Sequence, residues 1–287
     1  MSEELILSPS DPGWHERRRE VFTASDMGVL FGLPGFGGKT LSDVAFVKKY
    51  GLTTDNSTPS TRLGQRMEPI ILDEAEMTLG RIIDRQAWLI NGQIGATLDG
   101  RCESNGFPVE AKTSGLLWKP DAEWGDGGDE VPSAILLQVQ AQLFVTGADQ
   151  GIVAAVIGGR GFMLYEIPRA GQLIEMMQTR VADFMSTLST DVAYPEPPQL
   201  ETLKRIRRQP HKIVPLSGEL VDRYRSVTES AKAAADAKET VQRELLAALG
   251  DAEAGDSGDG LWTYGEQSRK GYTVERTTFR TLRFKRN

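Results

Sequence analysis

The chain has 287 residues, a net charge of −7, and 39% hydrophobic and 25% charged residues. This length holds one large domain or a domain with an appendage, and this composition excludes an intrinsically disordered chain. The longest apolar runs, such as residues 151–157, are far shorter than the roughly 20 residues that span a bilayer, and the first residues are acidic where a signal peptide is basic. We therefore expect a cytoplasmic protein with a packed core and no membrane contact.

The cysteine and histidine content restricts the possible metal sites. A single cysteine, Cys102, excludes an intrachain disulfide and four-cysteine zinc or iron–sulfur sites. The two histidines, His15 and His211, are far apart and argue against a zinc site. Any bound metal is therefore expected to be a hard cation on carboxylates. The negative charge argues against polyanion binding by the whole surface but leaves a local basic face possible.

The first strongly periodic segment predicts a helix over 60–79. Its apolar residues recur at helical spacing, Ser60 is a candidate N-cap, and Gly80 is a natural C-terminal stop. Pro69 inside the segment is expected to kink the helix.

Three short segments with β-forming composition follow, at 81–90, 93–99 and 107–112. Asn91-Gly92 and Ser104-Asn105-Gly106 separate them, and both are turn-forming sequences. This pattern predicts three antiparallel strands.

The next segments predict a helix over 132–146, a hairpin of 151–157 with 162–167, and a helix over 172–188. Helices alternating with short strands indicate an α/β fold, with a mixed central sheet flanked by helices. Proline-rich residues 194–198 are typical of a junction. We therefore expect a core over 1–194 and a C-terminal appendage over 195–287.

The appendage combines a heptad-like segment with basic strands. Its stripe can pack as a helical hairpin or coiled coil, or simply against the rest of the chain. Short strands are expected at 260–264 and 272–284. Two basic clusters flank the helical part and can follow a nucleic acid backbone or protect an edge strand. The stripe consists of Leu220, Tyr224, Val227, Ala231, Ala234, Lys238, Val241, Leu245 and Ala248; the clusters are Lys204, Arg205, Arg207, Arg208 and Lys212, and Arg276, Arg280, Arg283, Lys285 and Arg286.

The most informative residues are Asp99, Glu110 and Lys112. If Asp99 ends one strand and the other two lie on the next, the two-residue period of a strand places Glu110 and Lys112 on one face beside Asp99. Two adjacent carboxylates favour a divalent hard cation, which can activate water for hydrolysis of a phosphodiester. Glu68 on the preceding helix can add a carboxylate and a second metal position. The alternative is a surface hairpin with a salt bridge.

These residues resemble the PD-(D/E)xK nucleases, and among them the YqaJ and lambda exonucleases of phage recombination. Asp99, Glu110 and Lys112 match the motif, whose leading proline is replaced here by Leu98. Glu68 matches an upstream glutamate, and Gln138-Val139-Gln140 matches a Gln-x-Gln on the following helix. Arg18 and Thr23-Ala24-Ser25 match an N-terminal stretch. The resemblance extends over about 14–188.

The resemblance implies a restriction-endonuclease-like core and a 5′-to-3′ exonuclease that acts on double-stranded DNA ends and leaves 3′ single-stranded tails for recombination. Magnesium, or manganese, would bind Glu68, Asp99, Glu110 and the backbone carbonyl of Ala111, as one or two ions. Lys112 would position the attacking water, Gln138 would assist, and the 5′-phosphate would contact Arg18, Ser25 and Thr97. A single-strand annealing partner, a ring-shaped homotrimer and a phage or prophage origin in a bacterial cell are also implied.

Without the resemblance, the residues indicate metal-assisted phosphodiester hydrolysis with no strand polarity. Two alternatives therefore stay open: an endonuclease or nickase on the same core, and a non-catalytic scaffold that binds DNA ends. Trp118 and Trp124 can either stack on DNA or pack within their own loop.

Overall fold

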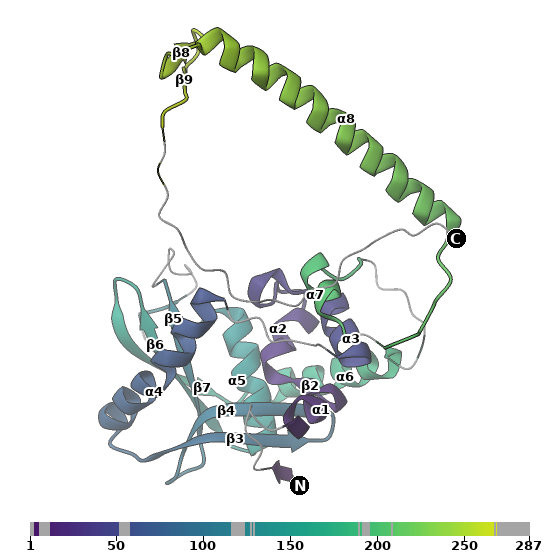
Figure 1. Cartoon of the computed structure of the whole chain (residues 1–287). Coiled ribbons are helices and arrows are strands. Elements are labelled where there is room, and N and C mark those ends of the chain that lie inside the picture. Colours follow the sequence, from purple (N-terminus) through teal and green to yellow (C-terminus); the bar gives the residue numbers. More distant parts are fainter. Residues whose placement is uncertain are drawn as a thin grey trace. The chain divides into compact units, whose positions relative to one another are not determined.

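The computed structural model describes residues 3–5, 12–51, 58–115, 124–126, 128, 130–188, 190, 196–207, 209–266 and 268. The chain divides into two compact units, the first running to Arg208 and the second covering Gln209–Thr278. The core-and-appendage boundary expected at residue 194 stays a prediction. Figure 1 labels most of the elements of both units.

Seven strands in the described part of the first unit form one mixed sheet. The sequence predicts a mixed sheet and five of its strands, whereas the short strands at 3–5 and 22–23 are additional. The order is β1-β3-β4-β5-β6-β7, and β2 pairs beside β4. The pairs β2–β4 and β5–β6 are parallel, and the others are antiparallel. The strands are β1 (Glu3–Leu5), β2 (Phe22–Thr23), β3 (Ile83–Asn91), β4 (Ile94–Cys102), β5 (Pro108–Ser114), β6 (Gln150–Ile157) and β7 (Gly161–Pro168).

Helices pack on both faces of this sheet (Figure 1). Alternate residues of a strand point to opposite faces. Accordingly, Ile152 of β6 packs with α4, whereas Val153 packs in the cluster that contains α5. The helical elements are α1 (Pro12–Glu20), η1 (Ala24–Asp26), α2 (Met27–Leu30), η2 (Phe36–Gly38), α3 (Leu41–Tyr50), α4 (Pro59–Leu79), α5 (Ser133–Thr146), α6 (Gly171–Thr187) and α7 (Leu200–Arg205).

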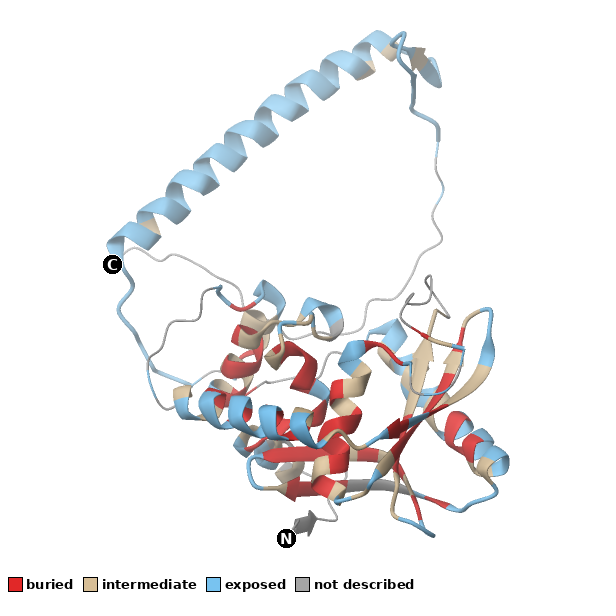
Figure 2. Cartoon of the chain, turned by 180° about the vertical axis from the view of Figure 1, so that it is seen from behind, coloured by how far each residue is buried: buried red, intermediate tan, exposed pale blue. Residues whose placement is uncertain are grey.

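The crossover from β5 through α5 to β6 joins two parallel strands in the middle of the sheet. Glu110 of β5 lies beside Val153 of β6 in this ladder. The second half of α5 is buried on all sides, from Leu137 to Val145, and Figure 2 shows much of this helix and of the strands beneath it as buried. The centre of the sheet therefore lies in the driest part of the unit.

The long helix α4 differs from its expected boundaries at its start. Its N-cap is Thr58, whose side chain accepts a hydrogen bond from the backbone N–H of Thr61, and Pro59 occupies the first turn. Ser60 is therefore inside the helix, because proline at the first position is compatible with the free N–H groups there. The helix continues through Pro69 and ends at Gly80 in the left-handed conformation, as predicted.

Helix α3 has no counterpart among the elements expected from periodicity. It begins with a capping box in which Thr40 accepts from the backbone N–H of Asp43 and the Asp43 carboxylate accepts from Thr40. The sequence signal was Thr-x-x-Asp before an apolar run, a variant of the usual Thr-x-x-Glu.

Residues 196–207, which begin within the proline-rich junction, pack on α3. Ser42 Oγ donates to the carbonyl of Glu196 at 2.5 Å, and the backbone N–H of Gln199 donates to Asp43 Oδ1 at 2.8 Å. Ile206 is buried, and the N–H of Arg207 donates to the carbonyl of Gly51 at 2.9 Å. These contacts tie the junction and α7 to the first unit.

In its described residues, the second unit consists of one long helix, α8 (Gly218–Leu249), followed by a small hairpin of β8 (Ala254–Asp256) and β9 (Leu261–Thr263). A continuous helix therefore takes the place of the helical hairpin considered above, and β9 corresponds to the strand expected at 260–264. The strand expected at 272–284 lies outside the described residues. None of the helices in the described ranges is both long and apolar enough to cross a bilayer.

The backbone of Gly158 lies in close contact with Ser114 and Gly115 at the end of β5, and a substitution of Gly158 tests this contact. Its N–H donates to the carbonyl of Ser114 at 2.8 Å, and a Cβ at this position would overlap the carbonyl group of Gly115, whose carbon would be 2.8 Å away. We predict that Gly158→Ala lowers the free energy of unfolding by about 1–3 kcal/mol. Gly171→Ala is the control, since a Cβ there has no neighbour within 4 Å. Equal chemical-denaturation midpoints for the two variants would contradict this packing.

Candidate functional site

Glu110 is the centre of a cluster of polar side chains on β5 and α5. It is 2% exposed, and both of its carboxylate oxygens accept hydrogen bonds. Lys112 and Gln138 donate to Oε1, the latter at 2.6 Å, and Gln142 donates to Oε2. Glu110 and Lys112 therefore share a face of β5, which is the arrangement that the two-residue period predicts.

Asp99 adjoins this cluster from β4. Its Oδ2 accepts from the backbone N–H of Ala111 at 2.9 Å. Burial raises the pKa of the Asp99 carboxyl well above its ordinary value, and the nearby charges of Glu110 and Glu68 raise it further. Burial opposes the charge of Lys112, but the carboxylates of Glu110 and Asp99 outweigh it and raise the pKa of the amine. The cluster is therefore crowded with negative charge that a cation can stabilise.

Glu68 approaches from the other side of the strand, on α4. This helix passes close to β5, since a Cβ on Gly64 would lie 3.8 Å from Thr113 Oγ1. The charge of Glu68 acts on both Asp99 and Lys112. The structure thus brings Glu68 into the neighbourhood of the carboxylates, as the sequence interpretation expects.

The donor set fits a hard divalent cation in its chemistry. Asp99, Glu110 and the carbonyl of Ala111 are oxygen donors, the type that magnesium and manganese prefer. Among the described residues, no three His, Cys, Asp or Glu side chains are grouped tightly enough to enclose a metal. This is compatible with magnesium, which typically uses one or two carboxylates together with water and substrate phosphates.

A second group of polar side chains surrounds Arg18, at the end of α1. The guanidinium donates to Thr97 Oγ1 and to Ser25 Oγ, each at 3.4 Å. It also lies over the ring of Trp14, with 4.5 Å to the centroid. The three residues expected to contact a phosphate are therefore together. We call Arg18, Ser25 and Thr97 the arginine group.

The geometry also distinguishes Arg18 from its two neighbours. Arg17 pairs with Glu20 at 3.1 Å on the surface, and Arg19 donates to the backbone carbonyls of Lys48 and Lys49. Of the three consecutive arginines, Arg18 is the one directed at Ser25 and Thr97.

The chain beneath the arginine group is held by a buried network. Lys39 Nζ pairs with Asp26 Oδ1 at 2.6 Å, and Thr23 Oγ1 donates to Asp26 Oδ2 at 2.8 Å. Burial would raise the pKa of Asp26, but Lys39 and Thr23 hold it below its ordinary value. Lys48 Nζ donates to the carbonyls of Arg18 and Val21, and burial lowers its pKa to about 8. These contacts fix the backbone on both sides of β2.

Sequence reasoning missed Gln142, which is fully buried against Glu110. Its signal was the four-residue spacing from Gln138, which places both amides on one face of α5. The expectation for Trp124 is decided in favour of packing. Its side chain is buried and packs against Tyr165 with the rings tilted by 43° and 5.2 Å between their centroids. Trp118 lies outside the described residues.

The Gln142–Glu110 contact generates a stability prediction. Without the amide donor, one oxygen of a buried carboxylate loses its partner, so we predict that Gln142→Leu lowers the unfolding free energy by about 1–3 kcal/mol. In a Glu110→Leu background the same change should cost close to nothing. Chemical denaturation in the presence of a chelator measures all four proteins, and an equal cost in both backgrounds would show that the contact does not contribute.

The chain is similar to several known proteins. The chain matches the model of the YqaJ-like viral recombinase domain over residues 13–149, the part that holds both groups. None of the curated proteins matches. Similar solved structures include an alkaline exonuclease from Laribacter hongkongensis, at 16% identity and a TM-score of 0.47 over 62% of this chain and 93% of that one. Another is a phage-related exonuclease from Haemophilus somnus 129PT, at 16% identity and a TM-score of 0.49 over 61% and 96%. Residues 13–149 are thus similar to the YqaJ-like viral recombinase domain.

Proposed function

We propose that the chain is a metal-dependent exonuclease that degrades one strand of double-stranded DNA from its 5′ end and leaves a 3′ single-stranded tail. The observation that carries the proposal is the position of Thr97 and Asp99 on β4. They are two residues apart, so they share a strand face at a separation of roughly 7 Å. Thr97 belongs to the arginine group, and Asp99 to the carboxylate cluster.

The general class of the protein follows from the family match. The match to a YqaJ-like viral recombinase domain supports a deoxyribonuclease of the phage exonuclease type. Strand polarity, the preference for duplex ends and the metal requirement belong to our proposal.

Asp99, Glu110, the carbonyl of Ala111 and Glu68 are the groups that would hold one or two magnesium or manganese ions. Such an ion would polarise the scissile phosphate and lower the pKa of water. Lys112 is held beside Glu110, where its ammonium can orient the attacking water and neutralise charge on the phosphate. Gln138 and Gln142 hold the Glu110 carboxylate in one orientation beside Lys112.

The arginine group supplies the preference for ends. A guanidinium with two hydroxyl groups beside it can bind the oxygens of a terminal phosphate, because charge-assisted hydrogen bonds to phosphate are strong and directional. A phosphate held there sits about one nucleotide from the Asp99 carboxylate on β4. Cleavage is then expected next to a 5′ end and not at interior sites.

Two alternative functions differ from this proposal in their use of the two polar groups. An endonuclease or nickase would use the same carboxylates without needing the arginine group. A non-catalytic scaffold would bind DNA ends without hydrolysis. An annealing-protein partner, a ring-shaped oligomer and action within a bacterial cell complete the proposal and rest on the family resemblance.

The carboxylate cluster is tested by Asp99→Asn, which keeps an acceptor for the Ala111 N–H but removes a charge. We predict that magnesium-dependent release of nucleotides from linear duplex DNA falls by roughly 10²–10⁴-fold. Asp149→Asn on the exposed turn before β6 is the control and should keep wild-type activity. Covalently closed circular DNA should stay intact with every variant, whereas its cleavage by the wild type would favour an endonuclease.

The arginine group is tested with linear duplexes that carry or lack a 5′-phosphate. The wild type should degrade the phosphorylated duplex faster, and Arg18→Ala should reduce this preference by roughly 10-fold or more. Arg17→Ala should retain it, since Arg17 pairs with Glu20 on the surface. If Arg18→Ala discriminates between the two duplexes as well as the wild type does, the phosphate is bound elsewhere.

A further inference from the structure

The second unit exposes a continuous apolar stripe along α8. Leu220, Tyr224, Val227, Val241 and Leu245 are 45–63% exposed, although they are large apolar side chains. Within the described part of the chain, α8 has no buried residue at all. A helix with this pattern ordinarily buries its apolar face against another element. The stripe is therefore a surface that requires an occupant.

The spacing of the stripe specifies the kind of occupant. Its members, from Leu220 to Ala248, alternate steps of four and three residues without interruption, and the two ends are 28 positions, or four heptads, apart. A strict period of 3.5 residues sustained for this length is typical of a coiled coil, because it keeps one seam facing a partner helix. A helix packed on a globular core follows the period of 3.6 and carries a wider apolar face.

We propose that the occupant is α8 of a second copy of this chain, aligned antiparallel in a two-stranded coiled coil. When the stripe overlaps from Leu220 to Leu245, Leu220 of one copy faces Leu245 of the other, Tyr224 faces Val241, and Ala231 faces Ala234. Large side chains then fill both ends, and the alanines meet at the middle, where they allow the helices to approach closely. The surface is thus complementary to itself, as a two-fold interface requires.

The charges beside the stripe favour the same alignment. Arg223 and Glu244 both flank the seam, and the antiparallel register brings each opposite the other in the second copy, forming two ion pairs. Lys238, the charged member of the stripe, faces Val227, along which its methylene stem can lie. A parallel alignment would place Lys238 against Lys238 and leave Arg223 opposite Thr228.

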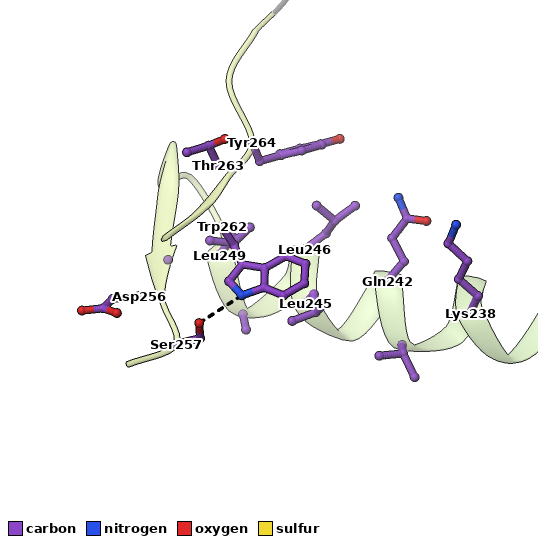
Figure 3. A pocket seen from close by; sticks show the side chains of 13 residues that line it. Lys238, Gln242, Leu245, Leu246, Leu249, Asp256, Ser257, Trp262, Thr263 and Tyr264 are labelled. Atoms are coloured by element: carbon purple, nitrogen blue, oxygen red, sulfur yellow. Dashed lines mark hydrogen bonds between the residues drawn. The ribbon is translucent and has the colours of Figure 1, made fainter. Parts of the chain in front are cut away.

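A pocket at the C-terminal end of α8 adds an independent feature. Lys238, Val241, Leu245 and Ala248 of the stripe line part of it, and Trp262 and Tyr264 after the turn of the hairpin form its other wall, enclosing ≈ 720 Å³. Trp262 is fixed by a hydrogen bond from Nε1 to Ser257 Oγ of 3.1 Å (Figure 3). In the proposed register, Leu220 and Tyr224 of the second copy reach this end of the helix, so the apolar pocket lies where apolar side chains arrive.

Sedimentation equilibrium of the full chain tests the pairing. The wild type should contain an even number of chains, and Tyr224→Asp should halve the mass, whatever association the first unit adds. Ser226→Asp is the matched control: it adds the same charge two residues away, outside the seam, and should leave the mass unchanged. A monomeric wild type, or equal masses for wild type and Tyr224→Asp, would overturn the proposal.

Cross-linking tests the direction of pairing. Two variants, Leu220→Cys and Leu245→Cys, are made in a Cys102→Ala background. Under mild oxidation neither variant alone should form a disulfide-linked dimer. An equilibrated mixture of the two variants should form one. Circular dichroism confirms that α8 stays helical in each. Cross-linking of either variant with itself would indicate parallel pairing, and no cross-link in the mixture would indicate that another segment or another protein covers the stripe; both outcomes overturn the antiparallel dimer.

Discussion

The burial of the Glu110 carboxylate is the constraint on which the rest of the site depends. An ionised carboxylate in the interior is very unfavourable unless donors surround it. Here the donors come from two elements: Lys112 from the same strand, and Gln138 and Gln142 from α5. Because α5 is the crossover between two parallel strands, the hydrogen bonds that stabilise the charge also hold this helix over the sheet at one rotation. The polar interactions and the fold therefore specify each other.

The alternation of buried and partly exposed residues along β4 lets this strand carry residues of both polar groups. Thr97, Asp99 and Arg101 are partly exposed, whereas the residues between them are buried. The buried set includes Leu98, which is fully enclosed in the core and stands where the family motif has proline. This position needs an apolar side chain and an extended backbone, and leucine supplies both. The departure from the motif therefore leaves the face that carries Asp99 unchanged.

The strands and the carboxylate cluster could be predicted because their determinants are local. Turn sequences at Asn91-Gly92 and Ser104-Asn105-Gly106 set the order of three strands, and the two-residue period then placed Glu110 and Lys112 together. Gln142 could not be separated from ordinary core residues, because its role depends on the rotation of α5 about its axis. The network of Asp26, Lys39 and Lys48 was equally inaccessible, since it joins segments that periodicity does not relate. Helix α4 is capped by Thr58 and not by Ser60, because several adjacent residues can act as an N-cap and the sequence alone does not fix the exact end of a helix.

The two units differ in how they bury their apolar side chains. The first has a seven-stranded sheet with helices on both faces, so its apolar residues can be buried within one chain. The second consists of α8 and a hairpin that packs on its last turns, where a Cβ on Gly255 would lie 2.8 Å from Leu249. That hairpin is too small to cover a helix of 32 residues. A helix in a protein gains most of its stability from packing its apolar face against another element. The exposed stripe of α8, with its period of 3.5 residues, therefore indicates assembly with a partner helix, whereas the core of the first unit gives no such indication.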